Sequence, residues 1–196
     1  MKYAIVVSGA AVTDHCAVDA HIKTEEIGRE VVRQGGLVLT GATHGMPLWA
    51  AKGAKAEGGI SIGISPAASH AAHVRSYRLP TEYMDFIIYT GSNYAGRNLL
   101  LTRAGDAVVI TCGRMGTLNE FTVAFEDNKP VGVLVETGGM ADEIEHIIGK
   151  AKRGPGKVIF DPDPKSLITR LIEMIDQERA KVDQGQFDDS FEKSGE

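Results

Sequence analysis

A glycine-containing segment over residues 111–117, followed by Glu120, has the residue types and spacing best suited to chemistry. Gly113 and Gly116 allow a tight turn at the end of a predicted strand, where backbone amides can converge on an anion. Thr117 and Glu120 also have the spacing of a capping box, which stabilises helix starts in proteins of every function. The spacing alone predicts an anion site or a helix cap, and it favours neither.

Three other turns could contribute to such a site. Two glycines precede a helix predicted to begin at Pro47, so backbone amides and the positive end of the helix dipole could face one anion. Arg97 stands at a predicted helix start, where the dipole disfavours a cation, and this indicates an external anionic partner. The alternative is a surface arginine paired with any carboxylate. Ser8 and Gly9 form a small-residue turn that could border a base or a sugar.

These turns must be positioned by the elements around them, and apolar runs alternate with helical patterns along the chain. Strands are predicted at residues 3–7, 37–40, 60–64, 84–89, 107–111, 131–135 and 157–160. Helices are predicted at residues 21–34, 47–57, 97–104, 117–128, 141–152 and 165–181. Continuous Val, Ile and Leu runs are typical of parallel strands covered on both faces. We therefore expect an α/β fold with a doubly wound, mainly parallel Rossmann-like sheet flanked by helices, which binds ligands at the carboxyl ends of its strands.

Length and charge narrow the class of protein. The chain has 196 residues, which suits one domain, and we expect this domain over residues 1–182. Residues 183–196 hold five carboxylates against one lysine and predict an acidic, disordered tail. The rest of the chain is nearly neutral and lacks the basic excess of a nucleic-acid binder. No apolar run is long enough to span a membrane, and the N-terminal run predicts a strand instead of a signal peptide.

Cysteine and histidine usage bears on the compartment and on metals. The only two cysteines, Cys16 and Cys112, predict a reducing, cytoplasmic environment without disulfides or a cysteine-rich metal site. His70 and His73 have a spacing of roughly one helical turn that is compatible with a metal, but no third ligand lies nearby. We therefore expect no metal site.

Taken together, these positions resemble the LONELY GUY-type phosphoribohydrolases, once called "lysine decarboxylase-like", within a wider group of Rossmann-like nucleotide-binding proteins. The family's hallmark is Pro-Gly-Gly-x-Gly-Thr-x-x-Glu, and residues 112–120 read Cys-Gly-Arg-Met-Gly-Thr-Leu-Asn-Glu. Arg97 resembles a second hallmark, an arginine near a helix start upstream of this strand. The turn over residues 41–46 resembles the family's glycine-rich turn, and the whole resemblance runs from about Lys2 to about Phe160.

The resemblance implies hydrolysis of the N-glycosidic bond of a nucleoside 5′-monophosphate to free base and ribose 5-phosphate, without a metal or organic cofactor. Glu120 would stabilise the oxocarbenium-like sugar or activate water, and Arg97 would hold the substrate or neutralise the leaving base. A homodimer or higher homo-oligomer is also implied, with a nucleotide or phosphate ligand as its small-molecule partner. The residues expected to bind this ligand are Gly113, Arg114, Gly116, Thr117, Gly41, Thr43, Gly45, Ser8, Gly9 and Asn98.

Arg114 departs from the hallmark because it stands where the family has the middle glycine. Its side chain could block the pocket, or its guanidinium could bind the phosphate. The consecutive residues Arg97 and Asn98 resemble those of a family branch that is related to molybdenum-cofactor carrier proteins. In such carriers the same pocket holds an anionic cofactor without cleaving it. The alternative function is therefore a non-catalytic binding or carrier protein for a nucleotide-like or molybdopterin-type phosphate ligand.

Overall fold

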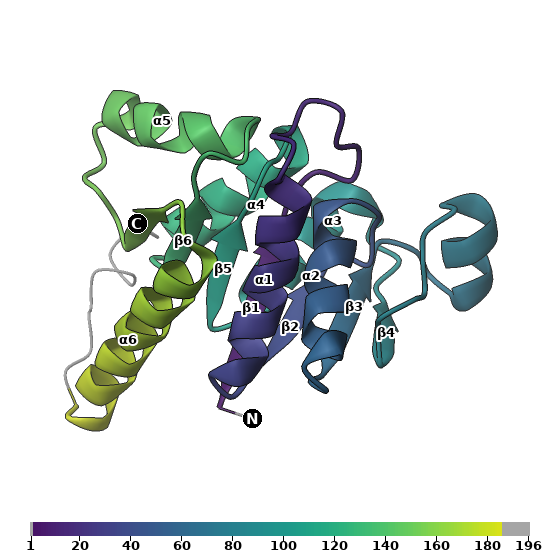
Figure 1. The fold of residues 1–196 in the computed structure, drawn as a ribbon, viewed down its shortest axis with the longest axis horizontal. Coiled ribbons are helices and arrows are strands. Elements are labelled where there is room, and N and C mark those ends of the chain that lie inside the picture. The colour runs from purple at the N-terminus through teal and green to yellow at the C-terminus, as the bar shows by residue number, and fades with distance from the viewer. Residues whose placement is uncertain (1, 186–196) are drawn as a thin grey trace, which may run out of the picture.

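A seven-stranded sheet runs through the centre of the computed structural model, which describes residues 2–185 (Figure 1). Every neighbouring pair of strands is parallel, in the order β4-β3-β2-β1-β5-β6-β7. The strands are β1 (Tyr3–Ser8), β2 (Gly36–Thr40), β3 (Ser61–Ser65), β4 (Phe86–Tyr89), β5 (Ala107–Ile110), β6 (Val131–Leu134) and β7 (Val158–Asp161). The chain builds the sheet outward from β1 to β4 and then returns to place β5 beside β1. This confirms the predicted doubly wound Rossmann-like fold.

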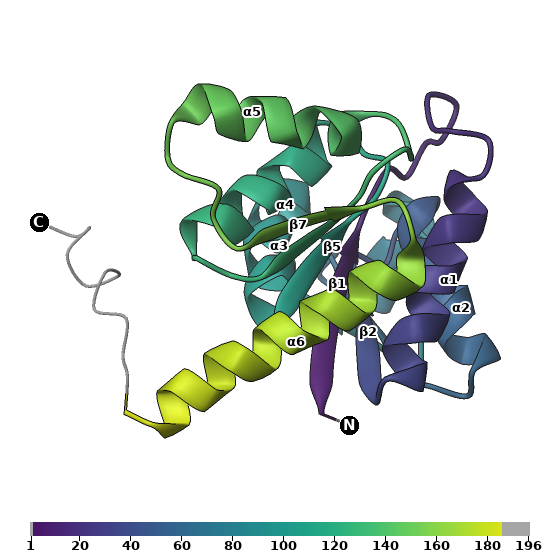
Figure 2. The same ribbon diagram turned by 60° about the vertical axis from the view of Figure 1, so that its left-hand side comes forward.

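Helices cover both faces of the sheet (Figures 1 and 2). One face carries α1 (Ala20–Arg33), α2 (Met46–Ala56) and α6 (Pro164–Asp183). The other carries α3 (Asn93–Ala104), α4 (Met115–Glu126) and α5 (Ile144–Ala151). Successive residues of a strand point to opposite faces, so Ile5 and Val7 join one hydrophobic core and Val6 joins the other. Burial on both faces explains the unbroken apolar runs in the sequence.

Two helices begin two or more residues earlier than predicted, and one predicted helix is divided. The α3 helix begins at Asn93 instead of residue 97, and α4 begins at Met115 instead of residue 117. In both cases a glycine assigned to the preceding turn, Gly96 or Gly116, lies inside the first turns of the helix. The segment predicted as one helix over 141–152 consists of a 3₁₀ turn at Met140–Glu143 followed by α5.

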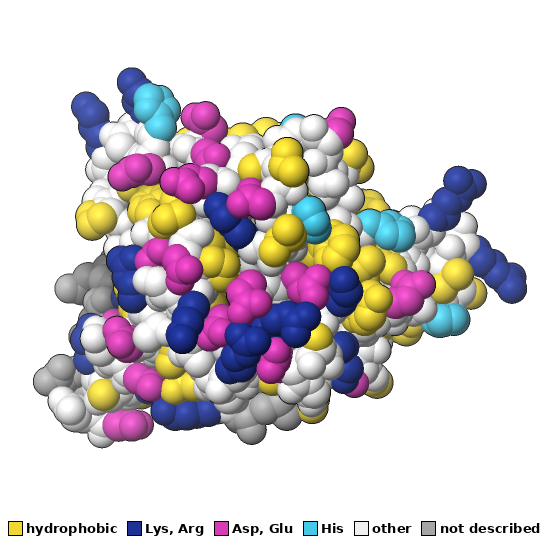
Figure 3. All heavy atoms as spheres, in the orientation of Figure 1, with side chains coloured by type: hydrophobic (Ala, Val, Ile, Leu, Met, Phe, Trp, Pro, Cys, Tyr) yellow, Lys and Arg dark blue, Asp and Glu magenta, His cyan; other side chains and the backbone are white. Residues whose placement is uncertain are grey.

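The C-terminal helix α6 extends to the start of the predicted acidic tail. Asp183, the first residue of the predicted tail, is the last residue of α6, whereas residues 186–196 lie outside the described residues. The single domain over residues 1–182 stays a prediction. Within the described part, no helix combines the length and the apolar character needed to cross a membrane. On the face of α1, α2 and α6, acidic and basic side chains are interspersed (Figure 3).

A disulfide joins Cys16, in the loop between β1 and α1, to Cys112 at the end of β5. The sulfur atoms are 2.02 Å apart, and the two residues are separated by 96 positions in the sequence. The expectation that the two cysteines form no disulfide is therefore wrong. The fold brings a loop near the N-terminus beside the fifth strand, which spacing alone does not reveal. The cytoplasmic location rested partly on free cysteines, and it stays a prediction.

Reduction of this disulfide should destabilise the fold, because the crosslink restricts the unfolded chain over a long loop. Such a crosslink contributes about 2–4 kcal/mol to the free energy of unfolding, which corresponds to a fall in Tm on the order of 10 °C for a chain of this size. Thermal unfolding with and without dithiothreitol, in a chelator, measures the effect. A double variant, Cys16→Ser with Cys112→Ser, should not respond to the reductant. Equal Tm values for the reduced and untreated wild type would contradict the assignment.

Candidate functional site

A cavity of about 260 Å³ opens at the carboxyl ends of β1, β2 and β5, where the chain changes direction across the sheet. Ligands bind at this switch point in open α/β folds. Its lining includes Ser8 and Gly9 after β1, Gly41 and Thr43 after β2, and the first turns of α3 and α4. The elements predicted to carry the site therefore meet at one edge of the sheet.

Ten of the twelve residues predicted for the site line this cavity. They are Ser8, Gly9, Gly41, Thr43, Arg97, Asn98, Arg114, Gly116, Thr117 and Glu120. The other two have backbone roles. Gly113 lies against the Thr117 side chain, leaving no room for a Cβ. Gly45 has a φ of 70° and packs against the Ala10 carbonyl, so a side chain there would be both strained and obstructed.

A buried carboxylate lies at the floor of the cavity. Glu120 is only 6% exposed, and its Oε2 accepts a hydrogen bond from the Ser8 hydroxyl. Its Oε1 is 3.4 Å from Nη1 of Arg97, which is also buried. Asn98, with its amide nitrogen turned toward Glu120, donates to the same Oε1 at 3.0 Å and to the Tyr94 carbonyl at 2.9 Å. Glu120 therefore joins β1, α3 and α4 through one side chain.

Burial raises the pKa of the Glu120 carboxyl above its ordinary value of 4.5, and Arg97 and Ser8 oppose this rise only in part. Burial also lowers the pKa of Arg97, although a guanidinium starts so high that it stays protonated. The Nε atom of Arg97 has no hydrogen-bond partner in the described part of the chain. An anionic ligand entering the cavity would thus approach a buried cation whose hydrogen-bonding capacity is incompletely used.

Arg97 also explains why a glycine stands at position 41. A Cβ on Gly41 would overlap the guanidinium of Arg97. Arg97 lies in the second turn of α3, because this helix begins at Asn93, so the inference that the dipole at a helix start disfavours this arginine was wrong. Its position instead follows from two buried contacts: the guanidinium packs against Gly41 and pairs with Glu120.

The N-terminus of α4 forms the wall opposite α3. Arg114 is the N-cap residue and makes no side-chain capping bond, and the first backbone bond of the helix runs from Leu118 N to the Arg114 carbonyl. The amides of residues 115–117 have no intrahelical partner and lie at the positive end of the helix dipole. The predicted capping box between Thr117 and Glu120 is therefore wrong. The helix begins two residues earlier, which places Glu120 in the second turn, facing Ser8.

Arg114 stands at the rim and does not fill the cavity. Its side chain is 54% exposed, and its Nη2 lies 2.7 Å from Oδ1 of Asp14. The guanidinium also contacts Nδ1 of His15, with Nε at 3.3 Å. Both partners belong to the loop between β1 and α1, so Arg114 closes this side of the cavity while leaving the helix amides behind it open.

Tyr94 and Leu101 line the cavity and were missed by the sequence analysis. Together with Arg97 and Asn98, they have the i, i+3, i+4, i+7 spacing of one helix face. That signal was present in the sequence, but it was overlooked because the helix was expected to begin at residue 97. By contrast, His73 of the His70–His73 pair takes part in the packing of the fold. It is buried, and its ring nitrogens lie 2.8 Å from the Ser65 hydroxyl and from the Pro80 carbonyl.

The family model for the SLOG cluster4 family matches residues 2–168. The chain belongs to the SLOG cluster4 family. An uncharacterized protein from Archaeoglobus fulgidus is 27% identical over 119 residues, which are 61% of this chain and 73% of that protein.

The fold of this chain is also found in solved structures, of which two are named for the molybdenum cofactor. The molybdenum cofactor binding protein from the phototrophic bacterium Rippkaea orientalis is 25% identical, with a TM-score of 0.73 over 89% of this chain and 98% of that one. The molybdenum cofactor carrier protein from Chlamydomonas reinhardtii is 24% identical, with a TM-score of 0.70 over 89% and 99% of the two chains. These findings confirm the resemblance to the LONELY GUY-type group and to its branch near the cofactor carriers.

The raised pKa of Glu120 predicts a pH-dependent effect of Glu120→Gln on stability. A carboxyl whose pKa is raised on folding contributes most below its unfolded pKa of 4.5, and this contribution is lost as the pH rises toward the folded value. The Tm of Glu120→Gln relative to the wild type should therefore increase as the pH rises above 4.5. Glu126→Gln, on an exposed position of the same helix, is the control. A difference for Glu120→Gln that stays constant with pH would refute the inference.

Proposed function

We propose that this protein binds a phosphate-bearing ligand of nucleotide or pterin type in the cavity and holds it without cleaving it. The observation that carries the proposal is the state of Glu120, whose two oxygens accept from Ser8, Arg97 and Asn98. A carboxylate with these partners has limited freedom to attack a sugar or to activate water. Its arrangement suits an internal support for the cavity better than a reacting group.

The phosphate would be held at the N-terminus of α4. Unpaired backbone amides and the helix dipole make such a terminus an anion site. Gly116 lies there with no atom within 4 Å of the place a Cβ would take, so a phosphate can approach its backbone closely. Arg114 stands at the rim, where its exposed guanidinium can exchange Asp14 for a phosphate oxygen. Arg97 adds a buried positive charge below.

The remainder of the ligand would extend over the rim. A cavity of about 260 Å³ is small for a whole nucleotide or pterin cofactor. Tyr94 is 47% exposed beside the opening, where its ring can stack on a planar base or pterin. The names of the two similar structures, which mention a molybdenum cofactor, support a pterin-type ligand.

Hydrolysis of a nucleoside 5′-monophosphate is the second candidate. It is favoured by the presence of Glu120 and Arg97, side by side in the lining of the cavity, the two residues that the family resemblance makes catalytic. For this reaction, Glu120 would have to face the ribose and stabilise positive charge as the glycosidic bond breaks. Release of free base distinguishes this function from binding alone.

Gly116→Ala tests the proposed phosphate site. The new methyl group fits the fold, because nothing occupies its place, and alanine favours a helix. It would stand where the phosphate approaches the backbone, so affinity should fall about 10-fold or more through loss of a charge-assisted contact. Gly149→Ala in α5 is the matched control, since its Cβ also meets nothing and it lies outside the cavity lining. The probes are inorganic phosphate, nucleoside 5′-monophosphates and molybdenum cofactor released from a molybdoenzyme.

The two readouts are ligand-induced Tm shift and chromatography of the incubated nucleotides. Binding predicts a rise in Tm in the wild type and in Gly149→Ala, a smaller rise in Gly116→Ala, and no free base. Free base that disappears in Glu120→Gln would establish the hydrolase instead. Equal Tm shifts in the two glycine variants would contradict the phosphate position, and no shift with any probe would contradict the proposed ligand class.

We also propose a homodimer formed through the exposed apolar surface of α3 and β4. Phe86 and Ile88 lie on the edge strand, in register with Ile62 and Ile64, which pack in the core on the α3 side of the sheet. Phe86 is 63% exposed, and Leu100 on α3 is 46% exposed. Large apolar side chains on an unpaired sheet edge are typical of an association surface.

Leu100→Glu combined with Phe86→Glu should convert this dimer into monomer, because two carboxylates would be buried in the interface. Light scattering coupled to size-exclusion chromatography gives the mass. Val182→Glu, at an exposed apolar position on α6, is the control and should remain dimeric. A wild-type monomer, or a double variant that stays dimeric, would refute the proposed interface.

A further inference from the structure

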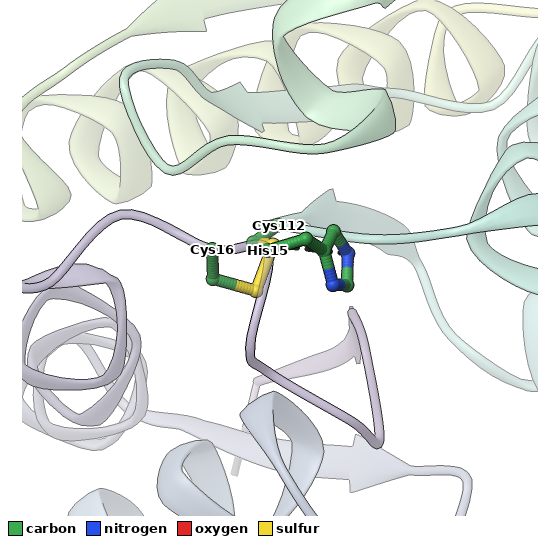
Figure 4. A group of neighbouring side chains, drawn as sticks. All are labelled: His15, Cys16 and Cys112. Atoms are coloured by element: carbon green, nitrogen blue, oxygen red, sulfur yellow. Dashed lines mark hydrogen bonds between the residues drawn. A yellow bond between two sulfur atoms is a disulfide. The ribbon is translucent and has the colours of Figure 1, made fainter.

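Three potential metal ligands meet beside the cavity. His15 and Cys16 come from the loop between β1 and α1, and Cys112 comes from the end of β5 (Figure 4). One ring nitrogen and the two sulfur atoms lie within 4.8 Å of one another. In Figure 4 the sulfurs are joined as the disulfide, and the imidazole of His15 lies next to them.

We propose that, after reduction of the disulfide, Cys16, Cys112 and His15 form a Zn²⁺ site. Two cysteine thiolates and one histidine are a known zinc ligand set, which leaves a fourth position for water or an external ligand. In the oxidised form the sulfurs are bonded to each other and no thiolate is available. Oxidation state would therefore control metal binding at this place.

The distances fit this ligand set. With Zn–S bonds of about 2.3 Å and a Zn–N bond of about 2.0 Å, tetrahedral ligand atoms lie about 3.5–3.8 Å apart. Nε2 of His15 is already 3.7 Å from Sγ of Cys112. The two sulfurs must separate, and a rotation of the part-buried Cys16 side chain can supply this movement, whereas Cys112 is fully buried.

Backbone hydrogen bonds hold the cysteines together without the disulfide. Ala10 N donates to the Cys112 carbonyl at 2.6 Å, and Cys16 N donates to the Thr13 carbonyl at 3.1 Å. Ala17 N donates to the Thr137 carbonyl at 3.0 Å, which fixes the same loop to the segment after β6. Both thiols should therefore stay near each other after reduction, so the ligands are already assembled when the metal binds.

A carboxylate orients the histidine. Oδ1 of Asp14 is 3.3 Å from Nδ1 of His15, and Nε and Nη2 of Arg114 lie 3.3 Å and 3.2 Å from the same nitrogen. For Nε2 to bind the metal, Nδ1 must carry the ring proton and donate it to Asp14, so the guanidinium must turn away from Nδ1 and keep only its contact with Asp14. The Arg114 guanidinium bridges to Asp14 at 2.7 Å. This contact holds the carboxylate in place and partly neutralises it. The metal-binding nitrogen would be Nε2, the atom that faces Cys112.

Two reactions lead to the metal-bound form: thiol–disulfide exchange and then metal binding. A dithiol reductant transfers two electrons and two protons to the Cys16–Cys112 disulfide and becomes a disulfide itself. Zn²⁺ then binds the two thiolates, and the thiol protons pass to solvent.

Co²⁺ titration of the full-length chain tests the site, because Co²⁺ occupies zinc sites and reports thiolate ligation by its absorption. Protein reduced with dithiothreitol and desalted without oxygen should bind one equivalent, with a sulfur-to-cobalt charge-transfer band and the visible bands of tetrahedral Co²⁺. Zn²⁺ should displace it. Oxidised protein should show none of these bands. This comparison needs no variant, so it does not depend on how a substitution folds.

Variants identify the ligands. Cys16→Ser and Cys112→Ser should abolish the two-thiolate spectrum, and Asp14→Asn should weaken metal binding about 10- to 100-fold while keeping the spectrum. His15→Ala should change the visible bands, whereas His146→Ala, at an exposed histidine on α5, should leave binding and spectrum unchanged. Absence of thiolate absorption in the reduced wild type would overturn the proposal. Binding that survives in the double cysteine variant would overturn it as well.

Discussion

The buried contact between Glu120 and Arg97 is the constraint on which the cavity depends. A carboxylate and a guanidinium removed from water must be paired and hydrogen-bonded, because an unpaired charge in the interior is strongly destabilising. This requirement fixes α3 against α4 and draws Ser8 of β1 into the same network. It also requires a residue without a side chain at position 41, over which the guanidinium lies. The cavity is thus bounded by charges that stabilise one another.

The same network distinguishes binding from catalysis in physical terms. A group that reacts with a sugar must gain more in the transition state than in the ground state. Glu120 already accepts hydrogen bonds from an arginine, an asparagine and a hydroxyl before any ligand enters, and those from Arg97 and Ser8 offset the cost of its burial in part. By contrast, the amides at the start of α4 have no internal partners and are available to an anion. The groups of the cavity that lack internal partners are therefore those suited to the proposed ligand.

Much of this arrangement could be predicted because it follows from local sequence. Continuous apolar runs identified all seven strands, and the strand order then placed Ser8, Gly41, Arg97 and Glu120 at one edge of the sheet. The first residues of the helices were harder to predict from the sequence, because a glycine such as Gly116 is equally compatible with a loop and with the first turn of a helix.

The Cys16–Cys112 disulfide and the pairing of Arg114 with Asp14 could not be predicted. Each joins segments about a hundred residues apart, and such contacts depend on how the loops at the sheet edge pack. For the same reason, the cluster of His15 with the two cysteines was invisible to spacing rules, which search for ligands close together in the sequence. Local pattern predicted residues that line one cavity, and tertiary packing decided how their side chains are paired.

The doubly wound topology has a consequence for synthesis of the chain. Ser8 and Glu120, which meet at the floor of the cavity, are separated by 112 residues. A ribosome-bound chain that stops short of Glu120 possesses β1 and its glycine turn but neither the amides of α4 nor the carboxylate that fixes Arg97. The proposed anion pocket can therefore form only after Glu120 has been synthesised, and incomplete chains would not sequester the ligand from finished molecules.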